Sequence, residues 1–256
     1  TRTFYLVQDT TPPAEGTFGF SALGTGYYYR TDNATLYYKS GGSNTVPLMV
    51  TVTPTWCSEA LSTTASGFAG YALSSSGTPG ATIDLSSTGS KTLYAFDNVG
   101  NNRNKNFAYE ADAAAPWINL PTSSNDYRNT ISGISAGDAL SQLKSFTAGN
   151  ATVASATVWT DLTVGGGNTS ISGLTALGAN GNSDFIRVIL EDNVGNKLTR
   201  IYKRTRNSEN AYVLVQEGTD ATESRLTVAE RFAGYRNTAS GEKASAATLV
   251  QALQIV

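Results

Sequence analysis

The sequence of 256 residues contains no histidine and a single cysteine, and charged residues make up only 15% of it. The absence of histidine excludes Ser-His-Asp and Cys-His nucleophile activation, and every zinc site that uses imidazole. Because Cys57 is alone, no disulfide forms within the chain, and a free cysteine is most often buried and inert. No run of about 18 apolar residues occurs, so we expect no membrane insertion.

The charge balance excludes a further class of partner. Lys and Arg total 18, Asp and Glu total 20, and the only basic cluster is Lys203–Arg206. Nucleic acid requires a much denser positive surface, so we expect no nucleic-acid binding. The remaining carboxylates are scattered and are interpreted as solvated surface groups, so we expect no enzyme activity. These scattered carboxylates are Asp126, Asp138, Asp161 and Asp184.

Hydrophobic residues, at 40% of the chain, are sufficient for folded cores.

Two landmarks recur along the sequence. The pentapeptide Asp97–Asn101 (Asp-Asn-Val-Gly-Asn) returns 95 residues later as Asp192–Asn196. Each copy stands between two strand-like segments and predicts a hairpin. A proline junction also recurs, at Asp9–Pro13 and Asp112–Pro116. Proline restricts the backbone, so these junctions predict short, stiff linkers.

The segments between these landmarks are short, strand-like and separated by turn residues, which is typical of a β-sandwich. In the first repeat the expected strands are Ala34–Lys39, Pro47–Thr53, Phe68–Ser74, Ala81–Leu85, Lys91–Phe96 and Asn106–Glu110. In the second they are Trp117–Leu120, Ala139–Thr147, Thr152–Trp159, Asn168–Leu174, Asp184–Glu191 and Lys197–Tyr202.

Both ends of the sequence depart from the repeat. Phe4, Tyr5, Leu6 and Val7 predict a strand that belongs to a preceding or shared repeat. We expect it either to pair with the strand Ala211–Val215 or to be donated to a neighbouring subunit. After Asn207 a capping pattern at Asp220–Glu223 predicts a helix. The predicted organisation is therefore residues 1–10, two domains over 11–115 and 116–206, and a terminal cap or attachment element over 207–256.

The recurring motif resembles the bacterial immunoglobulin-like repeats of large surface proteins and adhesins, over residues 1 to about 205. The matching residues are Asp97, Gly100, Asn101, Asp112 and Pro116, then Asp192, Gly195 and Asn196, and Asp9, Pro12 and Pro13 at the start. The resemblance implies an all-β chain of tandem immunoglobulin-like β-sandwiches, here followed by a small C-terminal α/β element. It also implies a non-catalytic extracellular module at the cell surface, as a rigid stalk or filament-forming segment whose partners are neighbouring repeats or subunits.

The pentapeptide has two interpretations. In the first, Asp accepts hydrogen bonds from backbone N–H groups two residues on, and Gly takes the positive φ of a turn. In the second, the carboxylates and amides are oxygen ligands for calcium, a cofactor that the resemblance also implies. We prefer the turn, because each hairpin supplies few carboxylates. The candidate calcium ligands are Asp97, Asn98, Asn101, Glu191, Asp192 and Asp112.

Aromatic residues are concentrated in the first repeat, including Tyr27–Tyr29 and Tyr37–Tyr38. Tyr28 and Tyr38 are candidates for stacking on a surface glycan or contacting a host ligand, which is the alternative function. Packing in the core and at strand edges is the preferred interpretation, because strands are generally rich in aromatic residues.

Overall fold

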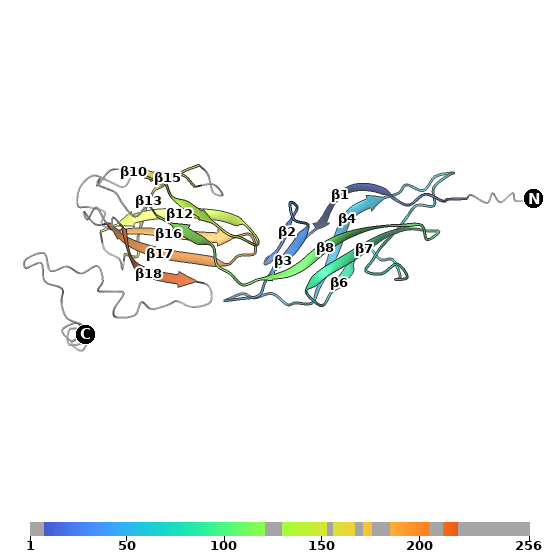
Figure 1. Cartoon of the computed structure of the whole chain (residues 1–256), viewed down its shortest axis with the longest axis horizontal. Helices are drawn as coiled ribbons and strands as arrows, with labels where there is room; N and C mark the ends of the chain where they lie inside the picture. The colour runs from blue at the N-terminus through green and yellow to red at the C-terminus, as the bar shows by residue number, and fades with distance from the viewer. Residues whose placement is uncertain are drawn as a thin grey trace, which may run out of the picture. The chain divides into compact units, whose positions relative to one another are not determined.

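The computed structural model describes residues 8–120, 130–152, 156–166, 171–175, 185–204 and 212–219. Every regular element among these residues is a β-strand, so the predicted all-β class is confirmed for them (Figure 1). The chain divides into two compact units, and the boundary along the sequence lies between Ala113 and Ala114. The predicted Phe4–Val7 strand and the helix predicted after Asp220 lie outside the described residues.

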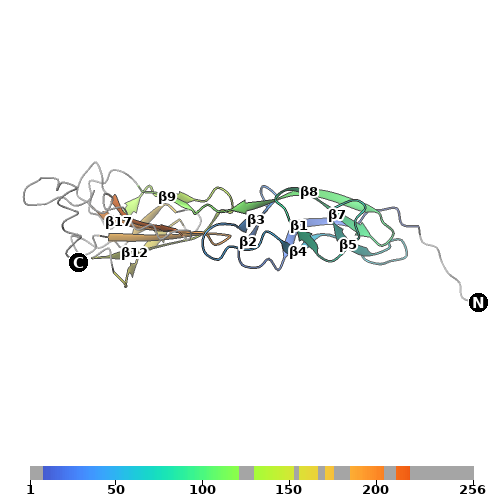
Figure 2. The ribbon, with the colours of Figure 1, turned by 90° about the horizontal axis from the view of Figure 1, so that it is seen from below.

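The first unit contains a five-stranded sheet in the order β2-β3-β8-β7-β5. Its strands are Tyr27–Arg30 (β2), Thr35–Lys39 (β3), Phe68–Ala72 (β5), Gly89–Asp97 (β7) and Asn102–Asp112 (β8). β3 and β7 lie on either side of β8 (Figure 1). Figure 2 shows the same strands turned by 90°. β3 runs parallel to β8, with Thr35 opposite Ala108, whereas the other pairs are antiparallel. A parallel pair cannot close through a tight hairpin, so this contact joins segments distant in sequence.

The second sheet of this unit has the order β1-β4-β6. Its strands are Ala14–Ser21 (β1), Val50–Ser58 (β4) and Ile83–Leu85 (β6). Alternate residues of β4 are buried, namely Val52, Pro54 and Trp56, as the two-residue period of a strand requires. One hydrophobic cluster contains residues of both sheets, among them Trp56 of β4 with Leu93 and Tyr109 of the larger sheet. Both sheets therefore contribute side chains to one core.

Strands β1 and β2 were not among the predicted strands. β1 contains Gly16 and Gly19, and glycine weakens an isolated strand signal. The structure explains Gly16, because a Cβ there would lie 2.9 Å from the carbonyl oxygen of Trp56. The close approach of β1 to β4 thus requires glycine at position 16. The same glycine makes the local sequence resemble a loop, which is why β1 was not predicted.

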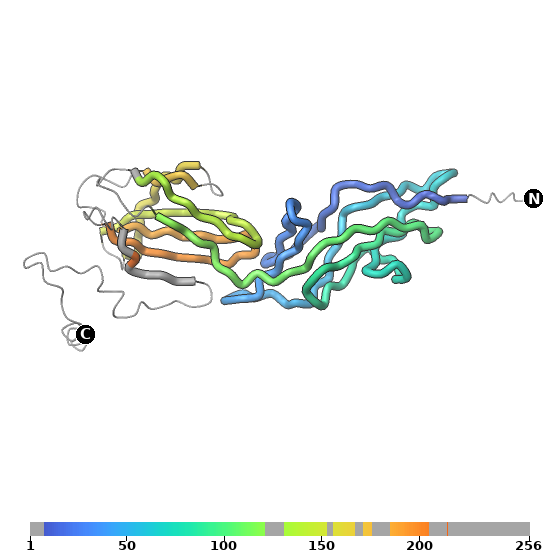
Figure 3. The backbone as a smooth tube through the Cα atoms, viewed as in Figure 1, coloured from blue at the N-terminus to red at the C-terminus, as the bar shows by residue number. Residues whose placement is uncertain are grey.

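The second unit contains a five-stranded sheet in the order β13-β12-β16-β17-β18, which the labels of Figure 1 follow. Figure 3 traces the backbone of the same sheet from β12 to β17. Its strands are Leu143–Ala151 (β12), Thr160–Asp161 (β13), Phe185–Asp192 (β16), Lys197–Arg204 (β17) and Tyr212–Thr219 (β18). Two smaller sheets have the orders β11-β9 and β10-β15-β14. Their strands are Trp117–Asn119 (β9), Thr130–Ser132 (β10), Ser135–Gly137 (β11), Thr163–Gly165 (β14) and Gly173–Thr175 (β15).

The core of the second unit draws on all of these sheets. Ile118, Ile131 and Leu174 of the smaller sheets belong to one cluster with Phe146 and Val188 of the larger sheet. Alternation along β16 is strict, and the strand predicted over Asp184–Glu191 is confirmed with its bounds shifted by one residue.

One strand predicted in the second unit is wrong in its described part, and another is confirmed over its described residues. The strand predicted over Thr152–Trp159 is wrong in its described part, because residues 156–159 form no strand. Trp159 is instead buried in a loop and donates its indole N–H to the Ala156 carbonyl at 2.8 Å. Residues 212–215 of the strand predicted at Ala211–Val215 belong to β18, which pairs antiparallel with β17 and covers one edge of the larger sheet. Ala211 lies outside the described residues.

Tyr71 links the two sheets of the first unit through its hydroxyl group. The hydroxyl accepts the backbone N–H groups of Trp56 and Cys57, both at 2.9 Å, and donates to the Cys57 carbonyl at 3.2 Å. Cys57 is buried, as predicted, and burial raises the pKa of its thiol to about 11. The thiol is therefore protonated and unreactive at neutral pH.

We expect Tyr71→Phe to lower the free energy of unfolding by about 1–3 kcal/mol, because two buried N–H groups lose their acceptor. Urea unfolding monitored by fluorescence measures the change. Tyr94→Phe is the control, since Tyr94 is half-buried on β7, and a change within about 0.5 kcal/mol is expected there. Equal effects of the two substitutions would contradict the role assigned to the Tyr71 hydroxyl.

Candidate functional site

The first pentapeptide forms a turn around the carboxylate of Asp97, which ends β7 and is 2% exposed. Its Oδ1 accepts the backbone N–H of Val99 at 3.0 Å and of Asn101 at 2.8 Å. Its Oδ2 accepts the side-chain amide of Asn101 at 2.7 Å. Gly100 has a φ of +95°, which favours glycine. The predicted turn chemistry is confirmed.

The second pentapeptide repeats this arrangement. Asp192 is fully buried, and its Oδ1 accepts the backbone N–H of Gly195 at 2.7 Å and of Asn196 at 2.8 Å. The amide of Asn196 donates to the other carboxylate oxygen at 2.8 Å. Gly195 has a φ of +94°. We call this arrangement of a buried aspartate inside its own turn, Asp97–Asn101 or Asp192–Asn196, the aspartate cage.

The second residue of each cage ties the hairpin to a neighbouring loop. Asn98 donates its amide to the Ser66 carbonyl and its backbone N–H to the Gly67 carbonyl, both at 2.9 Å. Asn193 donates its amide to the Ser141 carbonyl at 2.8 Å and its backbone N–H to Gln142 at 3.1 Å. Asn98 therefore has a structural role in which its amide N–H groups face the protein.

The proline junction of the first unit is attached to the same cage. Asp9 accepts the backbone N–H of Ser66 at 2.7 Å, and its own carbonyl accepts the amide of Asn101 at 3.1 Å. Arg103 donates Nε–H to the Pro13 carbonyl at 3.2 Å. The linker is thus held by residues that follow it by about 90 positions in the sequence.

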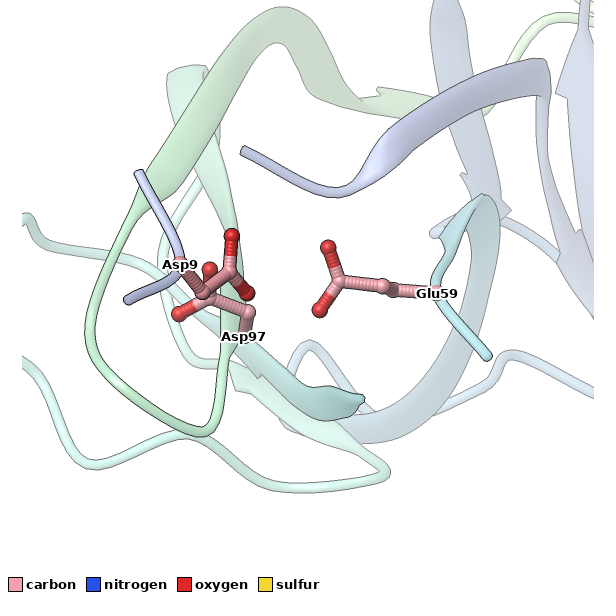
Figure 4. A group of neighbouring side chains, drawn as sticks. All are labelled: Asp9, Glu59 and Asp97. Carbon is pink, nitrogen blue, oxygen red and sulfur yellow. The ribbon is translucent and has the colours of Figure 1, made fainter. Parts of the chain in front are cut away.

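A cluster of three carboxylates lies beside this attachment. Asp9, Glu59 and Asp97 each offer an oxygen, and the three oxygens lie within 4.8 Å of one another. Figure 4 shows Glu59 reaching toward the two aspartates from the segment that follows β4. Carboxylate oxygens are the ligands calcium prefers, and a cation would offset the repulsion among the three charges. This donor set fits calcium, and Asp9, Glu59 and Asp97 would hold it.

Glu59 was absent from the predicted ligands because it belongs to no repeated motif. Its only signal is position, directly after a predicted strand, and that signal is shared by many acidic residues. Its side chain makes one hydrogen bond in the described contacts, accepting the Ser66 hydroxyl at 3.4 Å. Glu59 takes no part in the turn, in contrast to Asp97.

The electrostatics of Asp9 favour its ionised form. Hydrogen bonds from the backbone N–H groups of Ser66 and then of Thr11 lower the pKa of Asp9. Since the folded-state pKa is the lower one, the stabilisation from this contact is present above the ordinary Asp pKa of about 4 and is lost as the pH falls through the lowered value. The linker contact is therefore complete at neutral pH.

Glu191, another predicted calcium ligand, lies between two lysines. Glu191 forms ion pairs with Lys144 at 2.7 Å and Lys197 at 3.3 Å. Burial alone would raise the pKa of Glu191, but the hydrogen bonds and charges of these two lysines lower it overall. Asp112 ends β8, is fully buried, and accepts the backbone N–H of Ser40 at its carbonyl. The positive charges of the two lysines offset the negative charge of Glu191.

The two tyrosine candidates separate clearly. Tyr38 is buried, and its ring packs 5.0 Å from that of Tyr109, so it contributes to the core and is not available for surface stacking. Tyr28 stands opposite Tyr37 on the edge strand β2 and is half-buried. A ligand-binding role for Tyr28 stays a prediction.

Comparisons with protein-family models, with curated proteins and with solved structures found no significant match. Among the described residues, no helix is long and apolar enough to cross a bilayer.

We expect Asp97→Ala to lower the free energy of unfolding by about 2 kcal/mol or more, because the buried turn loses the acceptor of three donors. Asp161→Ala is the matched control, since Asp161 is exposed on β13 and should change the free energy by about 0.5 kcal/mol at most. Chemical unfolding of both variants provides the comparison. An Asp97→Ala variant with an unchanged free energy of unfolding would contradict a stabilising role of the cage.

Calcium binding by Asp9, Glu59 and Asp97 predicts a higher melting temperature in calcium than in chelator. Glu59→Gln removes one carboxylate without disturbing the turn and should abolish that difference. Glu110→Gln, outside the cluster, should preserve it. Calorimetry of the three proteins under both conditions measures the shift. An identical melting temperature of the wild type in calcium and in chelator would leave the cage with its turn role alone.

Proposed function

We propose that the chain is a non-catalytic structural module of a bacterial surface protein, a rigid stalk or filament-forming segment outside the cell. In this proposal each unit is an immunoglobulin-like β-sandwich, and neighbouring repeats or subunits are its partners. The extracellular location is proposed from the uncharged polar composition and from the motif resemblance.

The strand orders support the sandwich. In the first unit the sheets β1-β4-β6 and β2-β3-β8-β7-β5 share one hydrophobic cluster, as two packed layers require. In the second unit the smaller sheets contribute to one cluster with the sheet β13-β12-β16-β17-β18. Both units place their pentapeptide hairpin inside the larger sheet, joining β7 to β8 and β16 to β17. A shared hairpin position is expected of two copies of one fold.

The observation that carries the proposal is the attachment of the linker to the body of the first unit. Asp9 is bonded to Ser66 and to Asn101, and Pro13 is bonded to Arg103. Glu15, at the start of β1, accepts the indole N–H of Trp56 at 3.2 Å and pairs with Lys105 at 3.3 Å. A linker fixed at several successive points transmits force and direction, which a stalk requires and a flexible tether lacks.

The parallel ladder between β3 and β8 supports a load-bearing role. Five residue pairs connect the two strands, from Thr35–Ala108 to Lys39–Asp112. When force draws two neighbouring strands past each other, their ladder bonds share the load and must break together. β8 is also the strand that leads out of the first unit, so tension reaches this ladder directly.

Stretching a single molecule between its ends tests this function. We expect two discrete unfolding steps, because each unit should break cooperatively, with a gain of about 30–35 nm for about 100 residues. Asp97→Ala should lower the force of one step and leave the other unchanged, with Asp161→Ala as control. A gradual extension without steps would contradict the structural role.

A further inference from the structure

Three copies of the pattern Asn-X-Ser/Thr occur in the sequence, at Asn33, Asn150 and Asn168. This pattern is the acceptor signal for attachment of a glycan to an asparagine side chain. Because so short a pattern also arises by chance in a chain rich in Ser, Thr and Asn, its position in the fold is the deciding observation. A glycan is bulky and hydrated, so the asparagine that carries it must lie on the surface.

Asn33 lies at the tip of the hairpin that joins β2 to β3. The turn comprises residues 31–34, in which Asn33 is exposed, and the pairing of Arg30 with Thr35 closes it. Ala34 has a φ of +49°, which turns the chain sharply into β3. β2 is the last strand at one end of its sheet. An exposed residue at the tip of such an edge hairpin leaves room for a large substituent.

The contacts of Asn33 are compatible with a substituent on its nitrogen. The side-chain amide donates to the hydroxyl of Tyr37 at 3.0 Å. An asparagine amide has two N–H groups, and this bond uses one of them. A glycosylated amide keeps one N–H group, because the sugar takes the place of a single hydrogen. The bond to Tyr37 can therefore be retained after modification.

Asn150 provides an internal contrast. It is 5% exposed and lies within β12, where its backbone pairs with Thr160 of β13 and with Ile186 of β16. A glycan on this side chain would have no room in the folded unit. Asn168 lies outside the described residues. Within the part of the chain that the structure describes, Asn33 is therefore the acceptor that the fold leaves accessible.

We propose that Asn33 is a glycan acceptor, modified by transfer of an oligosaccharide from a lipid pyrophosphate carrier. The side-chain nitrogen forms a bond to the anomeric carbon of the first sugar, and the bond between this carbon and the pyrophosphate oxygen breaks. The pyrophosphate leaves with the electron pair of that bond, and the nitrogen gives one proton to a base of the transferase. The inference rests on the proposed extracellular location, because such transfer occurs on exported chains.

Thr35 determines when the transfer occurs. The acceptor pattern requires a hydroxyl at this position. In the folded unit, however, Thr35 is 5% exposed and donates its hydroxyl to the Asn33 carbonyl at 3.2 Å. Its strand also pairs with β8, which follows much later in the sequence. We therefore expect the transfer to precede the pairing of β3 with β8, while the chain is being exported.

Export of the full chain, directed by a signal peptide, from a eukaryotic host that glycosylates Asn-X-Thr tests the assignment. We expect peptide mapping by mass spectrometry of the secreted, folded protein to find a glycan on the peptide that contains Asn33. An amidase that releases N-linked glycans should remove it and leave aspartate at that position. The peptide that contains Asn150 should be unmodified.

Asn33→Gln and Thr35→Ala should each abolish the modification at this turn, whereas Thr35→Ser should retain it because the hydroxyl is kept. Asp161→Asn is the matched positive control. It creates an acceptor two residues before Thr163, and both positions are exposed. Its modification verifies that the transferase of the host acts on this chain, and the circular-dichroism melt of each variant verifies folding.

An unmodified Asn33 beside a modified Asp161→Asn variant would overturn the proposal, as would a Thr35→Ala variant that keeps its glycan. A glycan on Asn150 of the folded protein would contradict the selection of the acceptor by the fold. The stretching experiment is independent of these outcomes. Two unfolding steps together with an unmodified Asn33 would retain the structural function and eliminate the glycan.

Discussion

Burial of an aspartate carboxylate inside a five-residue turn is the constraint on which the rest of the structure depends. A buried charge is costly unless hydrogen bonds satisfy it, and the backbone of the turn supplies those bonds. Asp97 and Asp192 are both nearly inaccessible, and both are satisfied by the residues that immediately follow them. The carboxylate thereby sets the hairpin, and the hairpin sets the pairing of β7 with β8 and of β16 with β17.

The cage also organises parts of the chain that are distant in sequence. Its asparagines donate outward, Asn98 to the loop at Ser66 and Asn101 to the linker at Asp9. A turn formed by five consecutive residues is in this way connected to the loop at Ser66 and to the linker that precedes β1. The same connection brings Glu59 close to two aspartates, so one arrangement serves both a structural contact and a candidate cation site. The proposed roles share this origin.

Prediction from sequence succeeded where the physical cause is local. Gly100 and Gly195 were assigned to positive φ because no other residue adopts it as readily, and each hairpin was predicted from the strand-like segments on both sides of its pentapeptide. Prediction failed where a distant partner decides the conformation. β1 is a strand because it pairs with β4, and Gly16 permits the close approach of the two backbones. Trp159 lies in a loop although its sequence is strand-like, and its buried ring packs against the guanidinium of Arg187 on β16, 4.9 Å from the ring centroid.

The sequence by itself determined the all-β class, the two hairpins and the turn chemistry of Asp97 and Asp192, because each follows from interactions within a few residues. Only the tertiary structure decided the parallel pairing of β3 with β8, the meeting of Glu59 with Asp9 and Asp97, and the burial of Tyr38. It also decided that one cage valine is covered and the other exposed. The two identical pentapeptides do not predict which side chains pack against them, because those side chains come from residues distant in the sequence.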